Sequence, residues 1–230
     1  VFAVRQAQYT GSCFIGQGVD AVTVKRLYNE FIGRQVLQEQ GLSSQLNTYY
    51  AQIQQIDNMV ADPNSGLSPA IQEFFSAVNN VANNPESQPA RQGMISNANY
   101  LTSRFQSLNQ RMMDMNDSVN SQIRYSVTQI NSYAQQISAL NQNIIVAQSA
   151  NGQLPNDLMD QRDHLVTQLN QEIKATVVKQ SDGSFSVFVG NGQPLVVGVQ
   201  TFNMTTQMSA TDPAKLDVAY TFYNGATTSI

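Results

Sequence analysis

The sequence predicts an α+β fold, in which a long antiparallel helical rod of the coiled-coil type is followed by the start of a β-rich domain. Apolar residues recur at alternating steps of four and three, most extensively over residues 94–147, and this spacing indicates the rod. After Lys174 the apolar period falls to two, which indicates strands. The expected segments are a lead-in of loop and short strand at 1–26 that packs on the rod, a helical rod at 27–174, and an incomplete β domain at 175–230.

The first two helices are predicted from their apolar faces and from the turns that bound them. The first seam extends back to Phe31, and its later members are Leu42, Leu46, Tyr49, Ile53, Ile56 and Val60. Turn-forming residues at 62–66 end this helix. Ser68 is then expected to be the N-cap of a short second helix, with Pro69 at its first helical position, and Asn84-Pro85 follows its end.

The longest helix is predicted by the seam from Met94 to Ala147, which corresponds to about 80 Å at a rise of ~1.5 Å per residue. A helix of that length needs a partner along most of its course, so we expect the helices to fold back on one another. The residues expected in their common interior are Leu46, Ile53, Leu101, Leu108, Ile130 and Ile137.

A fourth helix and a set of strands are expected after a turn at residues 151–155. Either Asn156 or Asp157 is expected to cap the helix. Beyond it, Ser181-Asp182-Gly183 separates two apolar runs and predicts a β-hairpin, and Asn191-Gly192 predicts the next turn. The change of period near residue 174 predicts that the helical and β segments are separable there.

The composition excludes several classes of function. The chain has 12 scattered Lys and Arg against 16 Asp and Glu, so nucleic acid is not an expected partner, because phosphate backbones require concentrated positive charge. No apolar run approaches the roughly 20 residues of a membrane span, so we expect no membrane partner. One cysteine, Cys13, and one histidine, His164, exclude a Cys/His zinc site by count.

The best candidate for chemistry is an acidic cluster formed by Asp157, Asp160, Asp163 and His164. Asp160 and His164 share a helical face, and such a pair can hold a metal ion or transfer protons. The stronger alternative is that acidic residues gather there because the first turn of a helix favours negative charge. Neither a third strong ligand nor a nucleophile is apparent. We therefore expect no enzyme and no catalytic, cofactor-binding or metal-binding residue.

Two stretches lack charge completely, residues 125–156 and residues 40–56. Ordinary coiled coils use charged flanking positions to select partner and register, whereas here those positions are Gln, Asn, Ser and Thr. The neutral side chains either pack against other helices or subunits or face water, and the sequence leaves both readings open.

Several segments are similar to the sequence motifs of one known protein family. The run that begins Gly16-Gln17-Gly18-Val19 and continues to Gln35 is similar to the family segment G-x-G-V…R-x-Y-D-x-F-[LI]-x-x-Q, with Asn29 where Asp is usual. Pro89-Ala90-Arg91-Gln92 matches the P-x-A-R-Q start of the family's long helix. The most specific match is residues 158–166, LMDQRDHLV, which is close to L-L-D-Q-R-D-x-L-[VL]. In these segments the chain resembles the flagellar hook-associated protein 1 family.

The resemblance implies a structural protein that joins the flagellar hook to the filament and leaves the cell through the type III export channel. Implied partners are the hook protein, the second junction protein, further copies of the chain, and an export chaperone that binds a C-terminal segment. The terminal segments of the family are not recognisable, so an internal fragment is expected. Asp160, Gln161, Arg162 and Asp163 would form a helix-start and packing element. The alternatives are another axial flagellar protein, flagellin-like or the second junction protein, and a secreted helical adhesin or binding module.

Overall fold

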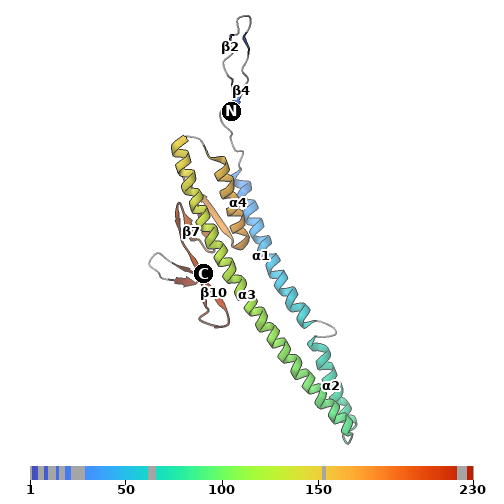
Figure 1. Cartoon of the computed structure of the whole chain (residues 1–230). Helices are drawn as coiled ribbons and strands as arrows, with labels where there is room; N and C mark the ends of the chain where they lie inside the picture. Colours follow the sequence, from blue (N-terminus) through green and yellow to red (C-terminus); the bar gives the residue numbers. More distant parts are fainter. Residues whose placement is uncertain are drawn as a thin grey trace. The chain divides into compact units, whose positions relative to one another are not determined.

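The computed structural model describes residues 2–4, 8–9, 14–15, 19–21, 29–61, 66–151, 154–221 and 227–229, with the backbone alone before residue 29. The chain forms two compact units. The first unit comprises Val1–Gly41 and Ile130–Asn203, and the second comprises Leu42–Gln129 and Met204–Ile230. Figure 1 shows the course of the chain through its helices and strands.

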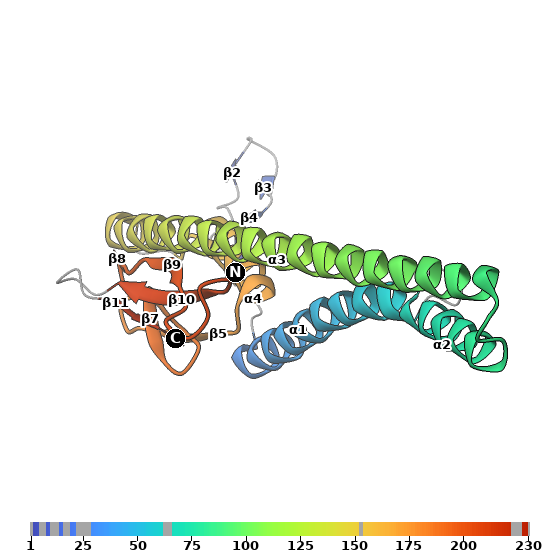
Figure 2. The same cartoon turned by 90° about the horizontal axis from the view of Figure 1, so that it is seen from below.

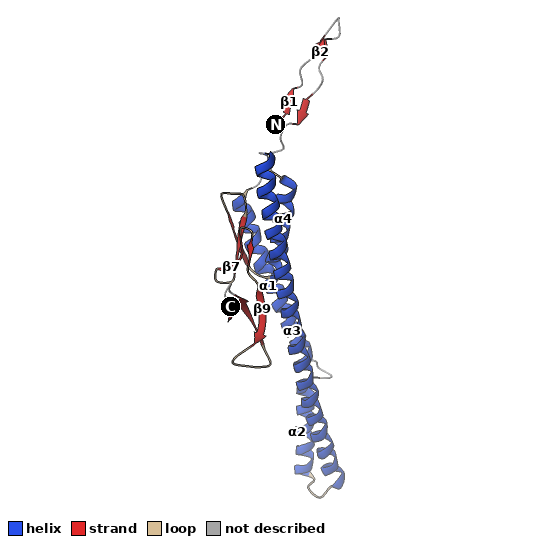
Figure 3. Cartoon of the chain, turned by 60° about the vertical axis from the view of Figure 1, so that its left-hand side comes forward, coloured by secondary structure: helices blue, strands red, loops and turns tan. Residues whose placement is uncertain are grey.

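The described chain contains four helices followed by antiparallel strands, which confirms the predicted fold class (Figure 3). The helices are α1 (Glu30–Val60), α2 (Leu67–Asn83), α3 (Gln88–Asn151) and α4 (Asn156–Glu172). The side-chain Oδ1 of Asn29 accepts hydrogen bonds from the backbone N–H groups of Phe31 and Ile32 at 3.0 and 3.3 Å. Asn29 therefore acts as the N-cap of α1, a position that an asparagine fills as well as the more usual aspartate.

Two predicted caps are wrong. Gly66 is the N-cap of α2, and Ser68 lies inside the first turn, where Pro69 is tolerated because the N–H groups of that turn have no intrahelical acceptor. Pro155 occupies the N-cap position of α4 and makes no side-chain cap, so Asn156 and Asp157 are already helical. The predicted turn at 62–66 lies mostly outside the described residues.

The first two pairs of strands lie in the lead-in. They are β1 (Phe2–Val4), β2 (Gln8–Tyr9), β3 (Phe14–Ile15) and β4 (Val19–Ala21), and β1 pairs with β4 and β2 with β3, both antiparallel. The expected packing of this lead-in on the helices involves side chains outside the described residues.

The first unit contains a four-stranded antiparallel sheet in the order β5-β6-β7-β8. Its strands are β5 (Ala175–Lys179), β6 (Phe185–Val189), β7 (Gln193–Val197) and β8 (Gln200–Thr201). Gly183 and Gly192 occupy the two predicted turns with φ of 84° and 103°, a left-handed conformation that glycine adopts without steric cost. The two hairpins expected from the sequence are confirmed.

The second unit contains a three-stranded antiparallel sheet in the order β11-β10-β9. Its strands are β9 (Met204–Met208), β10 (Leu216–Thr221) and β11 (Thr227–Ser229). Asn120 of α3 binds the backbone at the start of β10. Its side chain donates to Ala214 O at 2.8 Å and accepts from Leu216 N at 3.2 Å. One asparagine thus fixes the end of a strand to the helix.

The core of the first unit lies between the C-terminal half of α3, helix α4 and the sheet β5–β8 (Figure 2). Its buried apolar residues include Ile130, Ala134, Ile137, Ile144, Val166, Leu169, Val187, Val189, Leu195 and Val196. The predicted burial of Ile130 and Ile137 is confirmed, at 3% and 0% exposure. The strands therefore share a core with the helices that precede them, and the compact units divide the chain differently from the three expected segments.

The predicted burial of Leu46 and Ile53 is wrong, since these side chains are 56% and 44% exposed. Leu101 and Leu108 are half-buried. The physical reason is that α1 packs through another face. In the first unit, a Cβ at Gly41 would lie 3.1 Å from the Asn170 amide, and in the second unit Met59 is buried.

Candidate functional site

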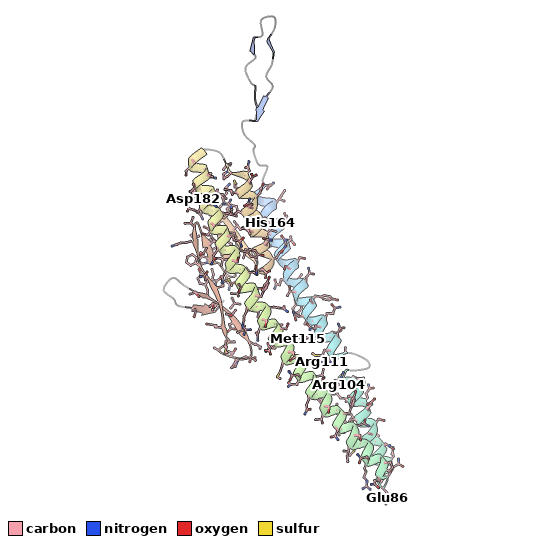
Figure 4. The ribbon with its side chains drawn as sticks, in the orientation of Figure 1. Glu86, Arg104, Arg111, Met115, His164 and Asp182 are labelled. Carbon is pink, nitrogen blue, oxygen red and sulfur yellow. The ribbon has the colours of Figure 1, made fainter. Side chains whose placement is uncertain are left out.

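The acidic cluster that the sequence singled out lies along the first turns of α4. Asp157, Asp160 and His164 are exposed and Asp163 is half-buried. Figure 4 shows His164 on this helix. Among the described residues, the structure brings together no group of three or more His, Cys, Asp or Glu side chains that could hold a metal ion. Cys13 lies outside the residues whose placement is described.

A buried polar cluster, which we call the hub, occupies the core of the first unit. At its centre is Asn141, with no exposed surface. The Asn141 amide donates to Phe185 O at 2.8 Å and to Gly198 O at 2.6 Å. Its Oδ1 accepts from Phe185 N at 3.0 Å and from Arg162 Nη1 at 3.0 Å. Both donors and both acceptor positions of the carboxamide are therefore used, as a buried polar group requires.

The second member of the hub is Arg162 of α4, the arginine of the Asp-Gln-Arg-Asp segment, which is also fully buried. In addition to its bond to Asn141, Nη1 donates to Gly183 O at 2.8 Å. The guanidinium carbon lies 3.4 Å from the centre of the Phe185 ring, so the cation stacks on the aromatic face. The interpretation of this segment as a packing element thus agrees with the position of Arg162.

Sequence reasoning missed Asn141, and it placed Arg162 in a packing element only through the family resemblance, although the residues themselves carried a signal for both. Arg162 follows Leu158 by four residues and precedes Val166 by four, so it lies on the apolar face of α4. Asn141 stands between Ile137 and Ile144 at steps of four and three. A polar residue at a core position of a periodic pattern indicates a buried group with dedicated partners.

A third asparagine connects further segments of the first unit. Asn170 of α4 is 2% exposed. It donates to Leu37 O of α1 at 2.5 Å and accepts from Ala175 N of β5 at 3.0 Å. With Asn120 and Asn141, it shows that buried asparagines bind strand backbone to helices in this chain. Of these three residues, Asn141 lies in the charge-free stretch 125–156, and neither open reading holds for it, because its side chain packs against this chain's own β5–β6 hairpin.

The turn that precedes the hub contains a carboxylate with a perturbed pKa. Hydrogen bonds from the Ser184 hydroxyl and backbone N–H, at 2.6 and 2.9 Å, lower the pKa of Asp182 below its usual value. Figure 4 labels Asp182. Because the folded-state pKa is depressed, this carboxylate stabilises the fold above the unfolded-state pKa, and the contribution is lost as pH falls through the folded-state value.

We expect Asp182→Asn to flatten the dependence of stability on pH in the acid range. The free energy of unfolding of the parent chain falls between about pH 5 and pH 2 in part because Asp182 takes up a proton, and the variant has no such proton to bind. Urea unfolding at a series of pH values measures the slope. Asp160→Asn, which removes an exposed carboxylate of α4, is the control. An unchanged slope in Asp182→Asn would contradict the assignment.

An exposed apolar surface, which we call the α1 stripe, lies on the second unit's part of α1. It consists of Leu42, Leu46, Tyr49, Ile53, Ile56 and Val60, with exposures between 36% and 66%. Their 4/3 spacing is that of a coiled-coil seam, and no charged residue lies between positions 40 and 56. Contiguous apolar surface of this kind typically marks a protein interaction site.

A shallow cavity of about 390 Å³ lies beside the end of α1 in the second unit. Figure 4 labels Arg111 and Met115, which line it together with Met59 and Asp114. Two thioethers beside one charge of each sign favour no particular ligand chemistry. Separately, none of the helices in the described ranges is long and apolar enough to cross a membrane.

Comparison with known proteins decides the family. The family model described as the flagellar hook-associated protein FlgK helical domain matches residues 53–230, more than three quarters of the chain. The chain belongs to the flagellar hook-associated protein FlgK family. It is similar to flagellar hook-associated protein 1 of Salmonella typhimurium, with 39% identity over 90% of this chain and 38% of that protein, and of Escherichia coli K12, with 36% identity over the same shares.

A solved structure of this family has the same fold. It is the flagellar hook junction protein FlgK from Burkholderia pseudomallei, which is 38% identical, has a TM-score of 0.77, and is matched over 86% of this chain and 36% of its own. The present FlgK-family chain therefore spans little more than a third of the length of the relatives it matches.

Proposed function

We propose that this chain forms part of a structural protein that joins the flagellar hook to the filament. The family membership supports this role, and the α1 stripe is the feature of the molecule that carries it. A chain that acts alone gains nothing from six exposed apolar side chains in a row, whereas a component of an assembly buries them against a neighbouring helix. Burial of apolar surface is the main favourable term in such association.

The proposed location is the outside of the cell, at the junction of hook and filament, which the protein reaches through the flagellar export channel. The proposed partners are the hook protein, the second junction protein and other copies of the same protein, with an export chaperone before secretion. No catalytic step belongs to this role. The charge-free stretch at residues 40–56 supports it further, because a neutral interface carries no desolvation cost for buried ions.

The test places a negative charge in the centre of the stripe. In the full-length protein, produced in its own bacterium, Ile53→Glu is expected to prevent stable attachment of filaments, because the partner helix would bury an unpaired carboxylate. Swimming in soft agar, filaments counted by electron microscopy and filament protein shed into the medium measure the effect. The free energy of unfolding of purified Ile53→Glu should lie within about 0.5 kcal/mol of that of the parent, because the site is exposed.

The matched control is Gln54→Glu. Residue 54 is also exposed, and the substitution places the same charge on the same helix. It points about 100° away from Ile53 around the helix axis. This variant should swim and retain filaments like the parent. Normal filament attachment in Ile53→Glu would show that the stripe is not part of the junction. Failure of both variants would indicate that charge anywhere on α1 blocks export or assembly, and would remove the stripe as the supporting feature.

A further inference from the structure

The hub joins four segments of the first unit that are distant in sequence. Asn141 comes from α3 and Arg162 from α4, whereas Gly183 and Phe185 come from the β5–β6 hairpin and Gly198 from the turn between β7 and β8. Each of the hydrogen bonds that define the hub runs between two of these segments. The hub is therefore complete only when the helix pair and the sheet are both formed and in contact.

The charge of Arg162 makes a partly formed hub costly in free energy. A guanidinium stays protonated at every pH at which proteins fold, so it cannot lose its charge to escape burial. When the sheet is in place, the side chain gains the Gly183 carbonyl and the Phe185 ring as partners. If the sheet loosened slightly while α4 stayed packed on α3, without room for water to enter, both partners would be lost. Removing one partner of a buried charge is far more damaging than replacing the whole arrangement by apolar groups.

The hydrogen bonds from the Asn141 side chain to the backbone of the sheet also make partial opening costly. Phe185 is bound through both its N–H and its C=O, and Gly198 through its C=O. A sheet that loosened from the helix without admitting water would leave the Asn141 amide, which lies among buried apolar residues, without these partners. A buried carboxamide with missing hydrogen bonds costs roughly 1–3 kcal/mol for each unsatisfied group.

We propose that Asn141 and Arg162 form a conformational latch that makes docking of the sheet β5–β8 on helices α3 and α4 all-or-none. With the latch, the strands open only when the helix pair opens too. Without it, the apolar core still holds the parts together, but the sheet opens by itself. One consequence rests on the proposed function. In a load-bearing assembly, the latch keeps the sheet from separating from the helices under force.

Hydrogen exchange of the purified chain, followed by mass spectrometry, tests the latch. In the parent chain, the amides of β6 and of α4 should exchange through one common opening, with rates within about threefold of each other after correction for intrinsic rates. In Arg162→Met, the β6 amides should exchange at least about tenfold faster than the α4 amides. The ratio, and not total stability, is the readout, because an apolar replacement of a buried charge is often neutral or stabilising.

Val166→Ala is the matched control, because Val166 lies one turn along α4 and is 3% exposed but makes no hub bond. It should speed exchange of β6 and α4 by the same factor. If Arg162→Met does not fold, Phe185→Leu gives the same comparison, since it removes the ring under the guanidinium and leaves the backbone bonds. A β6-to-α4 ratio that stays the same in the hub variant as in Val166→Ala would overturn the latch. So would a parent chain in which β6 already exchanges far faster than α4.

Discussion

Asn141→Ala is expected to lower the free energy of unfolding of the first unit by about 3–5 kcal/mol, because it leaves several buried groups without partners. The groups are the Phe185 N–H and C=O and the Gly198 C=O. Arg162 Nη1 loses its bond to Asn141 but keeps the one to Gly183 O. A new cavity adds to the loss. Urea unfolding followed by circular dichroism measures the effect as a lower midpoint concentration. The dependence of the free energy of unfolding on urea concentration should stay unchanged.

Asn143→Ala is the control for this variant. Residue 143 lies two positions further along α3 and is exposed, so the same chemical change removes no buried bond and should alter stability by less than about 0.5 kcal/mol. A loss of less than about 1 kcal/mol in Asn141→Ala would mean that water enters and satisfies the hub groups. In that case the bonds of Asn141 contribute to geometry but little to stability.

The order and type of the elements were predictable because the signals for them are local. Apolar spacing of four and three along 94–147 requires one long helix, and α3 covers that range. Turn residues such as Asp182-Gly183 fix a hairpin within a few positions, since glycine adopts the left-handed conformation that the turn needs. The caps at Gly66 and Pro155 were not predicted, because either helix can start one or two residues earlier or later at small cost.

Burial was less predictable, because periodicity gives the apolar face of a helix but not what covers it. On α3, the positions Ile130, Ile137 and Ile144 of the predicted seam are buried, and Val127, Ala134 and Asn141 complete the face. On α1, the apolar seam is exposed, while contacts are made through Gly41 and Met59. A small residue permits close approach of another helix, so packing there needs no apolar stripe.

Asn141 and the bonding of the hub escaped prediction for a related reason. In a sequence, an arginine or asparagine within an apolar pattern has the same appearance whether it interrupts the core or is buried in it. Only the strand backbone that reaches it from β6 and the β7–β8 turn distinguishes the two cases. The acidic residues beside it attracted attention because carboxylates and histidine carry recognisable chemistry, yet Asp160 and His164 lie on the exposed side of α4.

Ile137→Ala is expected to cost about 2–5 kcal/mol, whereas Ile53→Ala should change stability by less than about 0.5 kcal/mol. The two residues have the same side chain and both belong to a 4/3 seam, but Ile137 has no exposed surface and Ile53 is 44% exposed. Truncation at Ile137 leaves a cavity between α3, α4 and the sheet, while truncation at Ile53 removes surface already in contact with water. Urea unfolding of both variants decides between the packed and exposed assignments. A large loss in Ile53→Ala would mean that the α1 stripe is covered in the isolated chain, which would remove it as a surface for assembly.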